Sequence, residues 1–89
     1  MSIKVTNNSN ETYQVAINQW GTGGDTSYFT LTPGKSDSWD RTDFRGFVLS
    51  LQARGKSTAY IVFPEDDISI NESNVTANGK ALNHAVAAA

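Results

Sequence analysis

Apolar and polar residues alternate along most of the chain, and this period of two predicts β-strands. The segments with this pattern are residues 3–6, 13–18, 26–31, 36–39, 47–52, 58–63 and 68–70. They recur about every ten residues and are separated by short stretches rich in Asn, Ser, Gly and Asp, as in all-β sandwiches. The sequence therefore predicts an all-β fold, a small antiparallel β-sandwich of about six to eight short strands.

The turn residues predict how these strands connect. Residues 7–10 (Asn-Asn-Ser-Asn) form a turn cluster, which suggests a hairpin between the first two strands. Pro33-Gly34 is a type II turn signal, and it suggests that residues 36–39 return as the partner of 26–31. Asn78-Gly79 predicts a tight turn. Residues 68–70 are expected to form an edge strand.

Two other segments depart from simple alternation. The segment 58–63 carries Ala59, Ile61 and Phe63 on one face and Tyr60 and Val62 on the other, which indicates burial on two sides or a subunit interface. Residues 81–89 are rich in alanine and predict a short C-terminal helix that is too short to be stable alone.

Length and composition limit the classes of protein. An 89-residue chain has room for one domain, residues 1–89. The absence of cysteine excludes disulfides and thiol chemistry, so oligomerisation is the simplest way to enlarge the core. A net charge of -2 disfavours nucleic acid as a partner. No apolar run is long enough for a signal peptide or a membrane span, so we expect no membrane insertion and a cytoplasmic location, with release from the cell as a further option.

Catalytic equipment is sparse, and we predict that the chain is not an enzyme. The single histidine, His84, lies in the tail, and the Gly-rich loop at 21–25 lacks the pattern of a phosphate-binding loop. Asp37, Asp40 and Asp43 could serve a glycosidase or hold calcium, but a chain this short rarely builds a deep cleft. Neighbouring arginines also oppose cation binding, so no cofactor and no metal are expected.

The region from Trp20 to Phe47 fits carbohydrate recognition best. It holds both tryptophans, four aspartates and two arginines. An indole stacks on the apolar face of a sugar, while carboxylates and guanidinium groups bond its hydroxyls. The strand period places Trp20 on the polar side of residues 13–18, where it either covers a subunit contact or meets a ligand. The candidate carbohydrate-binding residues are Trp39, Asp37, Asp40, Arg41, Trp20 and Asp25. The competing interpretation is that one tryptophan is a core residue and the charged groups form a surface cluster.

Residues 15–21 (VAINQWG), 24–26 (GDT) and 31–41 (LTPGKSDSWDR) resemble the small mushroom lectins typified by the α-galactosyl-binding lectin of Lyophyllum decastes. The resemblance covers the first half to two-thirds of the chain and leaves out the alanine-rich tail. It implies a metal-independent lectin for galactose-containing glycans, a homodimer, and a cytoplasmic fungal protein acting in defence. The resemblance does not assign individual ligand-binding residues in this chain.

A different class of function stays open. The chain could be a protein-interaction or structural β module whose exposed aromatic face includes Trp20, Tyr28, Tyr60 and Val62. A membrane-acting toxin is a weaker third hypothesis.

Overall fold

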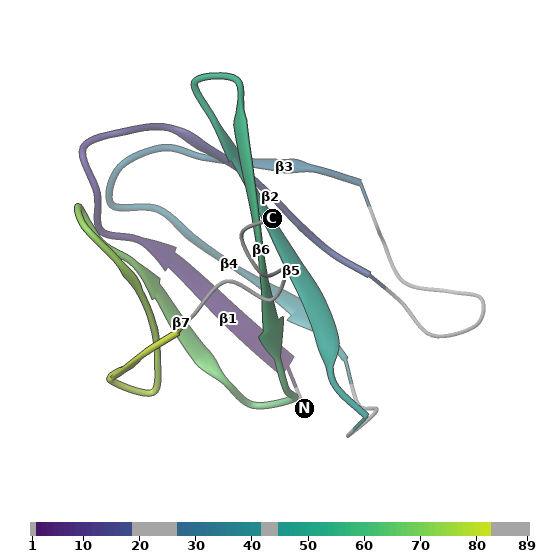
Figure 1. Ribbon diagram of the computed structural model, residues 1–89. Coiled ribbons are helices and arrows are strands. Elements are labelled where there is room, and N and C mark those ends of the chain that lie inside the picture. The colour runs from purple at the N-terminus through teal and green to yellow at the C-terminus, as the bar shows by residue number, and fades with distance from the viewer. Residues whose placement is uncertain (1, 19–26, 42–44, 83–89) are drawn as a thin grey trace, which may run out of the picture.

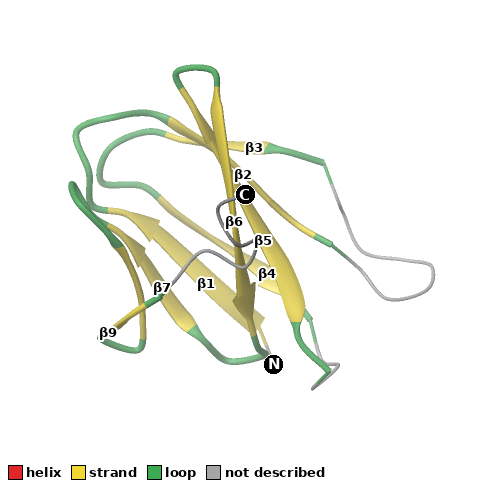
Figure 2. Cartoon of the chain, in the orientation of Figure 1, coloured by secondary structure: helices red, strands yellow, loops and turns green. Residues whose placement is uncertain are grey.

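The computed structural model describes residues 2–18, 27–41 and 45–82, and all statements below refer to them. Within these residues the fold is all-β, with strands in two sheets and no helix (Figure 1, Figure 2). The prediction of a small β-sandwich is confirmed. The strands are β1 (Ser2–Asn7), β2 (Tyr13–Ile17), β3 (Phe29–Leu31), β4 (Ser36–Asp40), β5 (Phe47–Ala53), β6 (Lys56–Val62), β7 (Asp67–Ile70), β8 (Val75–Ala77) and β9 (Lys80–Ala81).

The first sheet, sheet A, has the order β4-β1-β7-β8-β9. Strand β1 pairs antiparallel with β4 and parallel with β7, and this parallel pair departs from the predicted antiparallel pattern. The prediction that residues 68–70 form an edge strand is wrong, because β7 lies between β1 and β8. Its two isoleucines, Ile68 and Ile70, are fully buried, as expected for an inner strand.

The second sheet, sheet B, has the order β3-β2-β5-β6, and all its pairs are antiparallel. Strand β5 lies inside the sheet, as its apolar inner face predicts. In β6, Tyr60 and Val62 are buried, whereas Ile61 and Phe63, the residue that follows the strand, are exposed. The predicted exposed face that includes Tyr60 and Val62 is therefore wrong, and the apolar residues that reach solvent are those on the opposite side.

The two predicted hairpins near the N-terminus are also wrong, because each connection crosses from one sheet to the other. Strands β1 and β4 belong to sheet A, and β2 and β3 belong to sheet B. At the crossing the fully buried Asn7 side chain donates to the carbonyls of Glu11 and Leu31, at 2.7 and 2.8 Å. The side-chain oxygen of Asn7, Oδ1, accepts hydrogen bonds from the backbone N–H and the hydroxyl of Ser9. Through these hydrogen bonds, the Asn7 side chain ties the β1–β2 connection to the end of β3, where the β3–β4 connection begins.

Turn chemistry was predicted more reliably than strand pairing. At the Pro33-Gly34 turn, Lys35 N–H donates to Thr32 O at 3.0 Å and Gly34 has a φ of 85°, as a type II turn requires. Asn78 and Gly79 also have positive φ, as expected for the tight β8–β9 turn. The predicted C-terminal helix lies mostly outside the described residues, and Ala81, its first residue, is in β9.

The core lies between the sheets and is formed by the inward residues of both. Its buried members are Ile3, Val5, Val15, Ile17, Leu31, Trp39, Phe47, Leu49, Leu51, Tyr60, Val62, Ile68, Ile70 and Val75. Alternate residues on the strands of sheet B point out of the sandwich, so each of these strands has an inner and an outer face.

Candidate functional site

Trp39, the residue predicted to stack on a sugar, belongs to the core. Its side chain is 4% exposed and meets Phe29 edge to face, with ring centroids 5.7 Å apart. A buried indole offers no open ring face to a ligand, and this burial argues against the predicted stacking role. The cause is the period of β4, in which Trp39 is the one apolar residue and points inward. This is the alternative in which one tryptophan is a core residue.

Arg41, predicted to bond sugar hydroxyls, is also buried, at 3% exposed. Its guanidinium group donates to the backbone carbonyls of Ile17, Asn18 and Asp40, at 2.9, 2.9 and 3.0 Å. These bonds link the end of β4 in sheet A to the end of β2 in sheet B. The predicted ligand contact is replaced by a structural contact between the sheets.

Of the remaining predicted site residues, the structure describes Asp37 and Asp40. Asp37 and Asp40 are exposed on β4, and Asp37 accepts a hydrogen bond from the Ser38 backbone N–H at 2.8 Å. Trp20 and Asp25 lie outside the described residues. A sugar contact at Asp37 or Asp40 therefore stays a prediction, without the aromatic platform that Trp39 was expected to supply.

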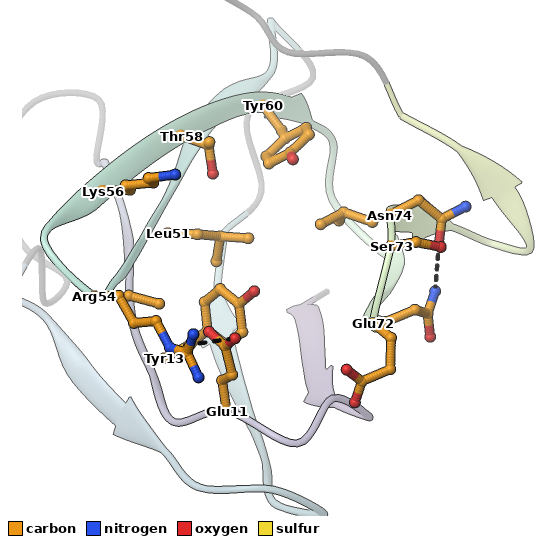
Figure 3. A pocket seen from close by; sticks show the side chains of 13 residues that line it. Glu11, Tyr13, Leu51, Arg54, Lys56, Thr58, Tyr60, Glu72, Ser73 and Asn74 are labelled. Atoms are coloured by element: carbon orange, nitrogen blue, oxygen red, sulfur yellow. Dashed lines mark hydrogen bonds and ion pairs between the residues drawn. The ribbon is translucent and has the colours of Figure 1, made fainter.

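A cavity of about 360 Å³ opens at the other end of β2, where this strand begins. It lies between the β5–β6 hairpin of sheet B and the loop that joins β7 to β8 in sheet A (Figure 3). Its volume falls in the range of ligand sites, about 300–1,000 Å³. The lining residues are Glu11, Tyr13, Leu51, Ala53, Arg54, Lys56, Thr58, Tyr60, Asn71, Glu72, Ser73, Asn74 and Val75.

Two tyrosines and a leucine give the cavity an apolar wall. Figure 3 shows Leu51 between Tyr13 and Tyr60, with Ser73 and Asn74 across the space from them. The pKa of the Tyr13 hydroxyl is raised above 10.0, chiefly by burial and then by the negative charge of Glu11 and other acidic neighbours. Tyr13 is therefore neutral at physiological pH, with a hydroxyl that both donates and accepts hydrogen bonds.

The polar groups on the opposite wall are held in place. Asn71 N–H donates to Asn74 O at 2.8 Å, and the side-chain amide of Asn71 donates to Asn74 Oδ1 at 3.1 Å. Ser69 also donates to Asn71 Oδ1, at 2.8 Å. These bonds close the β7–β8 loop on itself. They hold the backbone of the segment that carries Glu72, Ser73 and Asn74 beside the cavity.

Opposite charges balance around the cavity. Arg54 lies 3.4 Å from the Glu11 carboxylate, and Lys56 and Glu72 supply one further charge of each sign. Arg54 is largely exposed, so this ion pair contributes little to stability. A cavity without net charge and with both donors and acceptors favours a neutral polar ligand over an anion or a cation.

The described residues contain no group of three or more His, Asp or Glu side chains placed to hold a metal ion. In the same part of the chain, no helix is long and apolar enough to cross a membrane.

Sequence reasoning missed this cavity because its residues come from four separate segments. In the sequence, Tyr13 and Tyr60 stand out only as members of strand faces, and the polar run 71–74 carries no structural prediction. The signal available was a polar loop between apolar strands, which is common in β-proteins and does not indicate a ligand.

Comparison with known proteins gives no match: no protein-family model, no curated protein and no solved structure shows significant similarity to the chain. The resemblance to small mushroom lectins therefore stays a prediction.

Proposed function

We propose that the protein is a metal-independent carbohydrate-binding protein and that it binds sugar in the cavity between Tyr13, Tyr60 and the β7–β8 loop. The observation that supports this most strongly is the cavity's composition. The half-buried ring of Tyr13 offers apolar surface to the C–H face of a sugar, while Tyr60 lies buried in the wall behind it, and amide, hydroxyl and charged groups stand opposite. The same residue types were expected at Trp39, but here they line an open space.

The balance of charges favours a neutral sugar. Sugar hydroxyls donate and accept at once, so they need acceptors such as Glu72 and donors such as Lys56 side by side. A phosphorylated or carboxylated ligand would meet as much negative as positive charge in the cavity. The lectin resemblance makes terminal galactose the first sugar to test, and metal removal should leave binding unchanged.

The first experiment is a glycan array followed by titration calorimetry with the sugars that bind. We expect a dissociation constant between about 10 µM and 1 mM, because a small, open site makes few contacts. Tyr13→Phe removes one hydroxyl and should weaken binding about two- to tenfold, the usual worth of one neutral hydrogen bond. Glu72→Gln should weaken it by about tenfold or more, because hydrogen bonds to a carboxylate are stronger.

The matched control is Tyr28→Phe, which makes the same change at an exposed tyrosine outside the cavity. Its affinity should equal that of the unchanged protein. Binding that survives Tyr13→Phe and Glu72→Gln but is lost in Asp40→Asn would move the site to β4 and overturn the assignment to the cavity. An array without any bound glycan would overturn carbohydrate binding itself.

A further inference from the structure

Two hairpin turns in this chain have nearly the same sequence and the same kind of backbone. Residues 53–56 read Ala-Arg-Gly-Lys between β5 and β6, and residues 77–80 read Ala-Asn-Gly-Lys between β8 and β9. The outer residues of each turn are paired, and the two central residues have positive φ, 51° and 74° in the first turn and 53° and 86° in the second. Both are therefore two-residue type I′ turns. They differ at one position, which is Arg54 in the first turn and Asn78 in the second.

Arginine is the less favourable residue at this position. A left-handed φ brings the Cβ atom close to the backbone, and glycine and asparagine tolerate it best. The β8–β9 turn follows this preference, and the β5–β6 turn does not. The ion pair between Arg54 and Glu11 does not offset the cost, because the Arg54 side chain is 78% exposed. A strained residue without a compensating structural contact points to a role in function.

Arg54 lies at the cavity, whereas the β8–β9 turn does not line it. Figure 3 shows the Arg54 side chain with Glu11 on the side of the cavity where Tyr13 lies. The pKa of the Tyr13 hydroxyl, which burial raises most, is lowered in part by Arg54, so this positive charge acts on the cavity wall. Among the described residues, Glu11 is the one partner of the guanidinium group, with Nε 3.4 Å from Oε1. Since the group has five N–H donors, most of them remain available to a ligand.

We propose that Arg54 is a ligand-binding residue of this cavity and that it selects sugars with two free adjacent hydroxyl groups. The inference rests on the proposed sugar site and adds a specificity determinant to it. A guanidinium group is planar, and its parallel N–H groups bond two neighbouring oxygens at once, whereas the ammonium group of lysine is a point charge. Adjacent hydroxyls of a pyranose ring offer such a pair of oxygens. Glu11 balances the charge of Arg54, so the site still suits a neutral sugar.

The test measures stability and affinity together in two variants of Arg54. Arg54→Asn gives both turns the same sequence, so its urea midpoint should rise by about 0.5–1 M. Its affinity for the sugar selected on the array, with methyl galactoside tried first, should fall about tenfold in calorimetry, because hydrogen bonds from a charged donor are lost. Arg54→Lys keeps the charge and the strained backbone. Its midpoint should stay unchanged, while its affinity should fall at least about threefold because the planar fork is lost.

Monodeoxy derivatives of the same sugar test the selection of hydroxyls. In the unchanged protein, removal of either of two adjacent hydroxyls should weaken binding about fivefold. In Arg54→Asn, the same two derivatives should bind about as well as the parent sugar, because their partner is gone. Lys80→Gln is the matched control, since it removes the cation that follows the other turn, outside the cavity. This control should leave the affinity unchanged.

The outcomes separate this inference from the proposed function. Unchanged affinity in both Arg54 variants, beside the expected losses in Tyr13→Phe and Glu72→Gln, would overturn the role of Arg54 and leave the sugar site in place. Deoxy derivatives that show no dependence on an adjacent pair of hydroxyls would overturn the selection. A urea midpoint that does not rise in Arg54→Asn would overturn the argument from turn strain. An array without any bound glycan would overturn the proposed function and this inference together.

Discussion

Replacing Asn7 with alanine removes the side chain that fastens the two crossings between the sheets. Asn7 is fully buried and makes four side-chain hydrogen bonds, to Glu11 O, Leu31 O, Ser9 N and Ser9 Oγ. Alanine makes none of them, and the surrounding backbone groups lose a buried partner. Ser9 Oγ still donates to Glu11 O at 3.2 Å, so part of the network survives.

The expected loss in the free energy of unfolding is about 3 kcal/mol, since each buried bond is worth about 1 kcal/mol and an unpaired buried group costs more. A chain of this length is stable by roughly 4–13 kcal/mol. The substitution should therefore remove a large share of the stability. With a urea m-value of about 1 kcal/mol/M, the midpoint should fall by about 3 M.

Urea unfolding of Asn7→Ala beside Asn8→Ala measures this directly. Asn8 is exposed and donates to Ser69 Oγ at 2.7 Å, so the same change one residue along should cost at most about 1 kcal/mol. Equal and small losses in both variants would refute the reasoning that Asn7 joins the sheets.

Three further predictions concern stability. Gly46→Ala should cost about 1–3 kcal/mol in urea unfolding, because Gly46 has a φ of 97° and an added Cβ would lie 2.8 Å from the Phe63 ring; an unchanged midpoint would contradict this. Trp39→Phe should change stability by less than about 1 kcal/mol, since the buried Nε1–H has no partner among the described residues, whereas Trp39→Ala should cost about 3–5 kcal/mol. Equal losses from both Trp39 variants would argue that this N–H is bonded. Because the pKa of Tyr13 is raised, the contribution of Tyr13 to stability should be complete below pH 10.0 and decline above that pH. Tyr13→Phe should flatten the decline. An identical pH profile of stability in the variant would exclude Tyr13 as the source of the decline.

The alternating pattern predicted the strands and their faces because one face of each sheet is buried. It did not predict pairing, because the same alternation suits any neighbour. The connection from β1 to β2 looked like a hairpin, but Asn7 holds it as a crossing between sheets. Likewise β7 was expected at an edge, yet it pairs in parallel with β1, more than sixty residues earlier in the chain. The sequence around either strand gives no indication that two strands so far apart in the chain will pair.

The fold separates the neighbouring residues of the predicted site for a related reason. Sequence proximity grouped Trp39, Asp40 and Arg41, but adjacent residues of a strand point to opposite faces. Trp39 entered the core and Arg41 bonded backbone carbonyls at the end of β2, which left only the carboxylates exposed. The cavity, by contrast, joins Tyr13 and Tyr60 with the β7–β8 loop, and only the folded sandwich brings them together.

The most direct test of the central claim is to locate a bound sugar by amide chemical-shift mapping. Titration with a neutral sugar selected on the array should shift the amides of Tyr13, Thr58 and residues 71–75 that line the cavity, and leave residues 36–41 unchanged. Shifts confined to residues 36–41 would contradict the assignment of the cavity as the sugar site.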